Sequence, residues 1–461
     1  MHIGIDFGTS YSAAATYRNG RLEIIRFGDT AQFRTAVFFP EVVPDPNDFI
    51  LTPALEAEVE AHMRVLRSQQ QQFGATDRGD DALRRDATRV VRRQWLEERA
   101  RNSPTATLES FQYALFGDDA VYAYMEYGDG NLIESPKSML GFRMDSEVRK
   151  VIVHITTHIL EHIRLTASRQ LGEPVRSAVI GRPVQFRSSM GERGSEQAVE
   201  LIREAAAVAG FDEVSFMEEP AAAAMHYHKS LKDRQRALIV DIGGGTTDVA
   251  YAELGGGKHP QITRSWGLPK GGTDLDVNLS IHSFMPLLGN NVANVPVHHF
   301  VEAASVHNLP KQREFRKQSY RLVDEPWQSR LRNLQKPGAT TRLNQEAERT
   351  KIVLSAEAAH HSDLGFLEDG LGVNTTQPEL LEAISPFVNR LKRTFDDVNG
   401  DLAGLDIPAS VFLTGGTSRS PAVQAAVRDS FPQISLVKGD PSLGVVSGLA
   451  VAAAELDGMP P

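Results

Sequence analysis

The chain has 461 residues and a formal charge of −10, from 49 Lys and Arg against 59 Asp and Glu. This acidic balance argues against a general nucleic-acid or anionic-membrane binder. The absence of cysteine excludes disulfides, thiolate nucleophiles and cysteine-ligated metal clusters. Asp6 interrupts the N-terminal apolar stretch, and no apolar run approaches the ~20 residues that span a bilayer. We therefore expect a cytoplasmic protein of two or three domains without a membrane segment.

Strand and helix patterns alternate along the chain, which indicates an α/β protein. In chain order the sequence predicts strands at 2–5, 11–17 and 22–25, helices within 53–110, a helix at 147–171, a strand at 177–180, a helix at 198–209, a strand at 237–240, a mostly helical stretch at 340–359, a strand at 411–413, and helices at 421–431 and 445–456. Asn19-Gly20 predicts the first hairpin turn. Residues 53–110 are rich in Glu, Arg and Gln, so we interpret them as solvated helices inserted between two sheet elements.

One motif occurs twice. The stretch IGIDFGTS at 3–10 recurs as IVDIGGGTTD at 239–248. Each copy is an apolar strand that ends in Asp and leads into a glycine turn bearing hydroxyl side chains. Such a repeat predicts two related lobes that present their turns to a shared cleft. We expect lobe I at 1–230, completed by 438–461 and carrying the insert 53–110, and lobe II at 231–437.

The repeated turns have the chemistry of an anion site. Glycine lets backbone N–H groups approach a phosphate without obstruction by a Cβ. An Asp at the strand end would repel phosphate directly, so its sensible role is to hold a hydrated Mg²⁺. A solvated hairpin is the simpler reading of DFGTS alone, but three successive glycines in the second copy carry an entropic cost. The glycine-bearing segments GGTDLD at 271–276 and FLTGGTSRSP at 412–421 permit close approach of a flat ligand such as a nucleoside.

Together with SPKSMLG at 135–141, EEPAAA at 218–223 and ERTKIVLS at 348–355, these motifs resemble the DnaK-type heat-shock chaperone family. The similarity is closest to its short YegD-like members, within the superfamily of actin, sugar kinases and heat-shock ATPases. The resemblance implies a two-lobed actin-like ATPase fold, made of duplicated ribonuclease H-like domains, with a nucleotide cleft between the lobes. It also implies ATP and ADP binding with Mg, slow ATP hydrolysis, and a nucleotide switch that acts on a partner protein.

The resemblance also assigns roles, position by position. The implied catalytic residues are Lys137, Glu219, Asp248, Asp6 and Asp241, of which Asp6 and Asp241 would hold Mg²⁺ through water. The implied phosphate-turn residues are Gly8, Thr9, Ser10, Tyr11, Gly243, Gly244, Gly245, Thr246 and Thr247. The implied nucleoside-binding residues are Gly272, Glu348, Lys351, Ser355, Gly415, Gly416, Thr417 and Arg419. Two positions depart from the family pattern: Ile352 stands where an Arg often stacks on adenine, and Ser442 stands where an Asp is usual.

Other interpretations stay open at this point. A small-molecule kinase or an actin-type scaffold could use the same fold. The basic stretch from Arg84 to Arg93 could contact nucleic acid, but an acid-balanced solvated helix that docks a partner protein is favoured. The spacing of His154, His158 and His162 is compatible with a metal site, although an apolar helix face explains it more simply. The residues after Pro441 predict one terminal helix, so we expect no peptide-binding domain.

Overall fold

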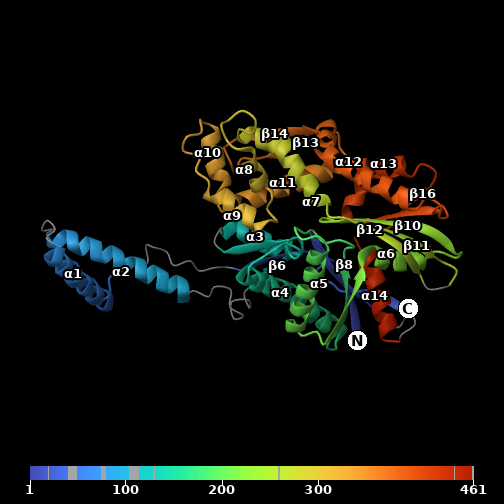
Figure 1. Ribbon diagram of the computed structural model, residues 1–461, viewed down its shortest axis with the longest axis horizontal. Helices are drawn as coiled ribbons and strands as arrows, with labels where there is room; N and C mark the ends of the chain where they lie inside the picture. Colours follow the sequence, from blue (N-terminus) through green and yellow to red (C-terminus); the bar gives the residue numbers. More distant parts are fainter. Residues whose placement is uncertain are drawn as a thin grey trace. The chain divides into compact units, whose positions relative to one another are not determined.

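The computed structural model describes residues 1–18, 20–39, 49–73, 79–102, 114–127, 130–257, 260–440 and 442–458 (Figure 1). Contacts divide the chain into two compact units. The first comprises Met1–Val37, Phe116–Glu126 and Leu132–Pro461, and the second comprises Phe38–Leu115 and Tyr127–Asn131. The lobe boundaries expected at 230 and 437 remain a prediction. Asn19 of the predicted turn, and residues 74–78 and 103–110 of the predicted insert, lie outside the described residues.

Two sheets with the same connectivity dominate the first unit. The first sheet has the order β3-β2-β1-β8-β9, with β4 added beside β2. Its strands are β1 (His2–Phe7), β2 (Tyr11–Arg18), β3 (Arg21–Ile24), β4 (Phe33–Arg34), β8 (Ser177–Arg182) and β9 (Glu213–Glu218). The second sheet has the order β12-β11-β10-β15-β16. Its strands are β10 (Gln235–Ile242), β11 (Thr247–Leu254), β12 (Gln261–Leu268), β15 (Ser410–Thr414) and β16 (Ser435–Lys438).

In both sheets a central strand pairs antiparallel with the next strand in the chain and parallel with a later one. Thus β1 pairs with β2 and β8, and β10 pairs with β11 and β15. The repeated motif therefore occupies the same place in each sheet, at the turn between the central strand and its hairpin partner. The α/β class and the duplicated architecture predicted from the sequence are confirmed.

Two helices of small residues pack with both sheets. They are α6 (Glu219–His228) and α14 (Gly444–Leu456). One core cluster joins Val179 of the first sheet, Ala222–Ala224 of α6, Leu449 of α14 and Ile239 of the second sheet. A Cβ at Gly448 would collide with the backbone carbonyl of Ala222, so α14 approaches α6 more closely than a larger residue would permit. The small-residue pattern of 445–456 thus reflects close packing.

The remaining helices of the first unit cover the sheets or form a separate helical layer. They are α3 (Gly117–Tyr127), α4 (Ser146–Leu171), α5 (Glu192–Val208), α7 (Gly272–Leu279), α8 (Val297–Ala304), α9 (Leu309–Lys317), α10 (Trp327–Leu334), α11 (Ala339–Val353), α12 (Gln377–Asp401) and α13 (Pro421–Ser430). Short strands complete the chain: β5 (Ala36–Phe39), β6 (Leu115–Phe116), β7 (Asn131–Glu134), β13 (Ala359–Asp363) and β14 (Gly372–Thr376). Helices α7, α12 and α13 share a core with the second sheet, whereas α8 to α11 surround their own core around Phe300, Phe315 and Leu343.

The second unit contains a helical hairpin, α1 (Pro53–Phe73) and α2 (Asp80–Asn102). Val59 and Met63 of α1 pack with Leu83, Ala87 and Val91 of α2. The guanidinium of Arg84 lies 2.7 Å from a carboxylate oxygen of Glu56. This pairing fits the acid-balanced helices predicted for the insert.

Two details differ from the sequence expectations. Within the stretch 340–359, which is predicted to be mostly helical, the helix ends at Val353 and strand β13 begins at Ala359. Val148 and Val151 belong to the apolar period of α4 but are 37% and 51% exposed. A periodic pattern identifies a helical face, but it does not tell where the neighbouring elements stop covering that face. None of the helices in the described parts of the chain is long and apolar enough to cross a membrane.

Candidate functional site

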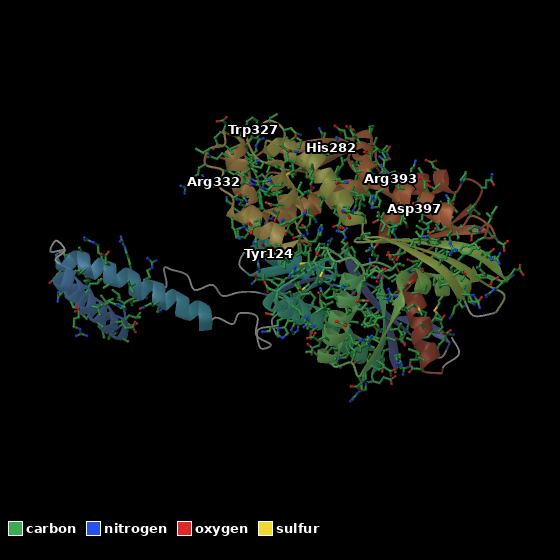
Figure 2. The ribbon with its side chains drawn as sticks, in the orientation of Figure 1. Tyr124, His282, Trp327, Arg332, Arg393 and Asp397 are labelled. Carbon is green, nitrogen blue, oxygen red and sulfur yellow. The ribbon has the colours of Figure 1, made fainter. Side chains whose placement is uncertain are left out.

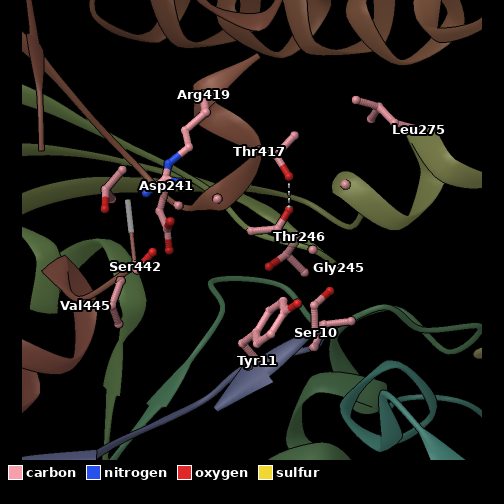
Figure 3. A pocket seen from close by; sticks show the side chains of 18 of the residues that line it. Ser10, Tyr11, Asp241, Gly245, Thr246, Leu275, Thr417, Arg419, Ser442 and Val445 are labelled. Atoms are coloured by element: carbon pink, nitrogen blue, oxygen red, sulfur yellow. Dashed lines mark hydrogen bonds between the residues drawn. The ribbon is translucent and has the colours of Figure 1, made fainter. Parts of the chain in front are cut away.

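A cavity of about 440 Å³ lies in the first unit, where the two repeated turns meet. All the predicted site residues line it except Thr247 and Asp248. Figure 3 shows Ser10 and Tyr11 on one side of this cavity, and Thr246, Thr417 and Arg419 on the other. The predicted site residues that line the cavity come from seven separate stretches of the sequence, which the fold brings around one space.

The two glycine turns face each other at close range. A Cβ at Gly244 would collide with the hydroxyl of Ser10, and a Cβ at Gly245 would collide with the hydroxyl of Thr9. Both hydroxyl-bearing residues belong to the first turn, and both glycines belong to the second. The absence of side chains in the second turn is thus what lets the two turns approach, and this approach narrows that end of the cavity.

The carbonyl groups of the second turn are held by neighbouring segments. The carbonyl of Gly243 accepts hydrogen bonds from the N–H of Gly272, at 2.9 Å, and from the hydroxyl of Thr417, at 2.9 Å. The carbonyl of Gly245 accepts one from Nε of Arg187, at 2.7 Å. The N–H of Gly243 is used within the turn, where it donates to the carbonyl of Thr246 at 3.0 Å. With these acceptors occupied, the turn can offer an anion its remaining N–H groups.

Lys137 and Glu219 form a buried ion pair beside the turns. Nζ of Lys137 lies 2.5 Å from Oε1 of Glu219, and the two side chains are 5% and 9% exposed. Lys137 sits in a single 3-10 turn that follows Ser135, whose φ of 54° is left-handed. Burial alone would lower the pKa of Lys137, but the carboxylates of Glu219 and Asp6 raise it above its ordinary value. The lysine therefore remains a cation inside the cavity.

Asp6 and Asp241 stand at the ends of β1 and β10, one in each copy of the motif. Burial raises the pKa of Asp6 to about 7, with a further contribution from Glu219 and an opposing one from Lys137. Burial also raises the pKa of Asp241 well above its usual value, and Glu219, Asp248 and Asp6 add to this effect. A group of buried carboxylates facing a single lysine fits a hydrated divalent cation, which would offset their mutual repulsion.

Asp248 and Thr247 lie behind the cavity wall. Asp248 is fully buried, and its Oδ1 accepts a hydrogen bond from the N–H of Val184 at 2.7 Å. Burial, followed by the charge of Glu219, raises the pKa of Asp248 to about 8. The hydroxyl of Thr247 donates to the carbonyl of Lys270. In the structure these two residues brace the second turn, and their implied roles toward a ligand remain predictions.

The other end of the cavity is lined by α7, α11 and the segment after β15. Nζ of Lys351 lies 2.6 Å from Oδ1 of Asp276, and Oε2 of Glu348 lies 3.0 Å from Nη2 of Arg34. The hydroxyl of Ser355, just beyond the end of α11, donates to the carbonyl of Lys351 in the last turn of that helix. Ile352 also lines the cavity and is 60% exposed, so an aliphatic side chain is available there as a packing surface.

Several lining residues have no counterpart among the predicted site residues. They are Gln32, Leu275, Asp276, Thr414, Ser420, Gly444 and Val445. Asp276 belongs to the GGTDLD motif and could have been found by asking which carboxylate balances Lys351. Gln32 and Val445 carry no local signal, because only the folding of the chain brings them to the cavity.

The spacing of the histidines on α4 is compatible with a metal site, but the structure gives these rings other surroundings. The ring of His162 stacks on Phe116 with centroids 4.3 Å apart. Burial lowers the pKa of His158 and of His162 to about 4, so both rings are neutral. In the part of the chain that the structure describes, no group of three or more His, Asp and Glu is arranged to hold a metal ion directly. Magnesium held through water, as predicted for Asp6 and Asp241, requires no such cluster.

Comparison with known proteins points in the same direction as the motifs. Residues 134–287 and 327–460 match the sequence model of the family described as "Hsp70 protein". The chain is 28% identical over 314 residues to the "Chaperone protein DnaK" of Cenarchaeum symbiosum, and 30% identical over 315 residues to that of Thermoplasma volcanium. Each alignment covers 66% of this chain but only 40% and 44% of those relatives. The chaperone protein dnaK of Guillardia theta is 24% identical over 467 residues, covering 99% of this chain and 60% of the relative.

Proposed function

Because the chain belongs to the Hsp70 family, whose members are nucleotide-binding chaperones and ATPases, we propose that this cavity binds ATP and ADP with Mg²⁺ and hydrolyses ATP slowly. The observation that carries the proposal is the pair of facing glycine turns with a buried lysine–glutamate pair beside them. Phosphoryl transfer needs little covalent help from a protein, and depends on positioning and on groups that offset developing charge. Each of those requirements has a candidate among the lining residues.

The proposed roles follow from position and charge. The N–H groups and hydroxyls of the two turns would bind the phosphates. Lys137 would offset the charge that develops on the transferred phosphoryl group, and Glu219, which holds its Nζ at 2.5 Å, would orient that ammonium and an attacking water. Asp6 and Asp241 would hold Mg²⁺ through water. When bound, the metal would neutralise the phosphate charge and order the water around it.

We further propose that the nucleotide state is passed to a protein partner, as a switch. The family resemblance and the helical hairpin of the second unit support this part of the proposal. A pull-down that compares wild type with a hydrolysis-deficient Lys137 variant would identify a partner retained in only one nucleotide state.

The direct test of catalysis is Lys137→Ala, assayed for Mg²⁺-dependent phosphate release from ATP. We expect turnover to fall at least about 100-fold, because a preorganised charge at the reacting group is worth roughly 3 kcal/mol or more. Lys392→Ala is the matched control, since Lys392 forms an exposed pair with Asp429. Unchanged turnover in Lys137→Ala would refute the role assigned to this lysine.

A small-molecule kinase on the same fold would need an acceptor pocket beside the phosphate turns. The structure has a small polar cavity there, bordered by Ser10, Arg34, Thr273, His307 and Glu348, with a volume of about 20 Å³. Such a space holds about one water molecule. This size favours hydrolysis over transfer to a sugar, and ADP formation stimulated by a metabolite would overturn that preference.

A further inference from the structure

Arg187 lies outside the large cavity, in the segment between β8 and α5, and its guanidinium reaches the second glycine turn. Its Nε donates to the carbonyl of Gly245 at 2.7 Å. Its Nη2 donates to the hydroxyl of Thr273 at 3.2 Å and to Oδ2 of Asp274, both at the start of α7. The side chain is only 13% exposed. A planar guanidinium with three acceptors is held in one orientation, and it fixes the orientation of those acceptors.

The segment that carries Arg187 is itself anchored on both sides. Phe186 is buried, and its N–H donates to the hydroxyl of Ser195 on α5 at 3.2 Å. On the other side, Ser188 forms an isolated β-bridge with Gly141. The main chain at Arg187 is therefore held by its neighbours, so the guanidinium projects from a fixed base. Support of this kind lets one side chain orient another group.

The bond from Arg187 fixes the direction of an N–H group as well as that of a carbonyl. A peptide unit is planar and trans, so the carbonyl of Gly245 and the N–H of Thr246 point in opposite directions. Gly245 and Thr246 line the large cavity (Figure 3), whereas Arg187 does not. Because the carbonyl is turned outward to Arg187, this peptide unit directs the Thr246 N–H toward the cavity.

The preceding peptide unit is held in the same way, through Thr273. The carbonyl of Gly244 accepts hydrogen bonds from the N–H of Thr273 at 2.8 Å and from its hydroxyl at 3.0 Å. A hydroxyl has one proton, so after donating to Gly244 it accepts from Arg187. Thr273 does not line the large cavity either, so the N–H of Gly245, opposite this carbonyl, is directed toward the cavity. Arg187 thus acts on two consecutive N–H groups, one directly and one through Thr273.

We propose that Arg187 is a positioning residue that aims the N–H groups of Gly245 and Thr246 at the phosphates of a bound nucleotide. The inference rests on the proposed function and adds to it a residue that sets how much the phosphates contribute to binding. Successive N–H groups form an anion-binding concavity, and hydrogen bonds weaken steeply when they are misaligned. Without Arg187, the Gly245 carbonyl would lose its outward partner, and the peptide unit would be free to turn that carbonyl toward the anion.

Comparison of a nucleotide with its nucleoside isolates the contribution of the phosphates. Isothermal titration calorimetry of the full chain measures the affinity for ADP with Mg²⁺ and for adenosine, which has no phosphate. For Arg187→Gln we expect the ADP affinity to fall about tenfold, since misdirected N–H groups lose hydrogen bonds to a charged ligand. The adenosine affinity should stay unchanged, so the ratio of the two affinities should fall by the same factor. A purely structural role would weaken both ligands alike.

Three further variants separate the hydrogen bonds of Arg187 from its charge. Arg187→Lys keeps the charge but loses the planar fork, so it should recover only a small part of the ratio. Arg164→Gln is the matched structural control, because Nε of Arg164 donates to the main-chain carbonyl of Ala209 at 2.6 Å and neither residue lines the cavity. Arg393→Gln removes an equal charge from the exposed surface of α12 (Figure 2). Both controls should leave the ratio unchanged.

An unchanged ratio in Arg187→Gln would overturn the inference, and so would an equal loss of ADP and adenosine affinity. Full recovery by Arg187→Lys would show that the charge acts and not the fork, which also overturns it. The same fall of the ratio in Arg164→Gln or Arg393→Gln would have the same consequence. Failure of the wild type to bind ADP at all would instead refute the proposed function.

Discussion

The two ends of the cavity are built in different ways. The proposed phosphate end consists of glycine turns whose carbonyls are held by their neighbours, so the main chain would supply the binding groups. The opposite end, where the nucleoside is proposed to bind, depends on side chains held in ion pairs, Arg34 with Glu348 and Lys351 with Asp276. It also carries the two departures from the family pattern, Ile352 and Ser442. A site made of main-chain groups tolerates little change in the shape of the backbone, whereas a site made of side chains can be altered by single substitutions.

The largest expected effect is steric and lies at the phosphate end. Gly244→Val places side-chain atoms where the Ser10 hydroxyl now lies, so the two turns must separate. We expect ADP binding to weaken at least about 100-fold, measured by titration with a fluorescent analogue. Gly400→Ala is the control, because a Cβ at Gly400 meets no atom within 4 Å. Near-normal binding by Gly244→Val would show that the approach of the turns is not required.

The second prediction concerns the dependence of the protein's stability on pH. The pKa of Asp248 is raised from 3.8 to about 8, chiefly by burial. The folded state therefore binds more protons than the unfolded state between these two values. Stability should consequently fall as pH rises from about 4 to 8.

Asp248→Asn should reduce this decrease in the free energy of unfolding between about pH 4 and 8 by at least about 1 kcal/mol, since one pKa unit corresponds to roughly 1.4 kcal/mol. The measurement is denaturant unfolding in the absence of nucleotide and magnesium across that pH range. Asn retains an acceptor for the Val184 N–H, which limits the structural damage. Parallel stability curves for the two proteins would contradict the assignment.

The smallest expected effect is a gain in ADP affinity, caused by a substitution at the end of the cavity where the nucleoside is proposed to bind. Ile352→Arg would restore a cation beside the base, and a cation–π contact is worth roughly 0.5–2 kcal/mol. We expect ADP to bind about three- to tenfold more tightly, as measured by displacement of the fluorescent analogue. Ile352→Leu should change little. Weaker binding by Ile352→Arg would mean that the aliphatic side chain is itself the better packing surface in this cavity.

The sequence predicted the phosphate end in detail because its signals are local. The strand, the Asp, the glycines and the hydroxyl residues follow one another, and their repetition predicted two related lobes. Asp276 and Lys351 were visible in the motifs, but their pairing joins α7 to α11. Arg187 carried no signal, since its three acceptors are 58, 86 and 87 positions away.

The sequence by itself thus determined the α/β class, the duplicated architecture, and many but not all of the residues that gather at the cavity. A periodic apolar pattern, a glycine turn and an Asp at the end of a strand each involve residues that are close together in the sequence. They can therefore be recognised without a structure. Tertiary structure decided that Asp248 and Thr247 stand behind the wall, that Lys137 is held by Glu219, and that Arg34 holds Glu348. Burial and ion pairing depend on which distant segments meet, and only the folded chain brings them together.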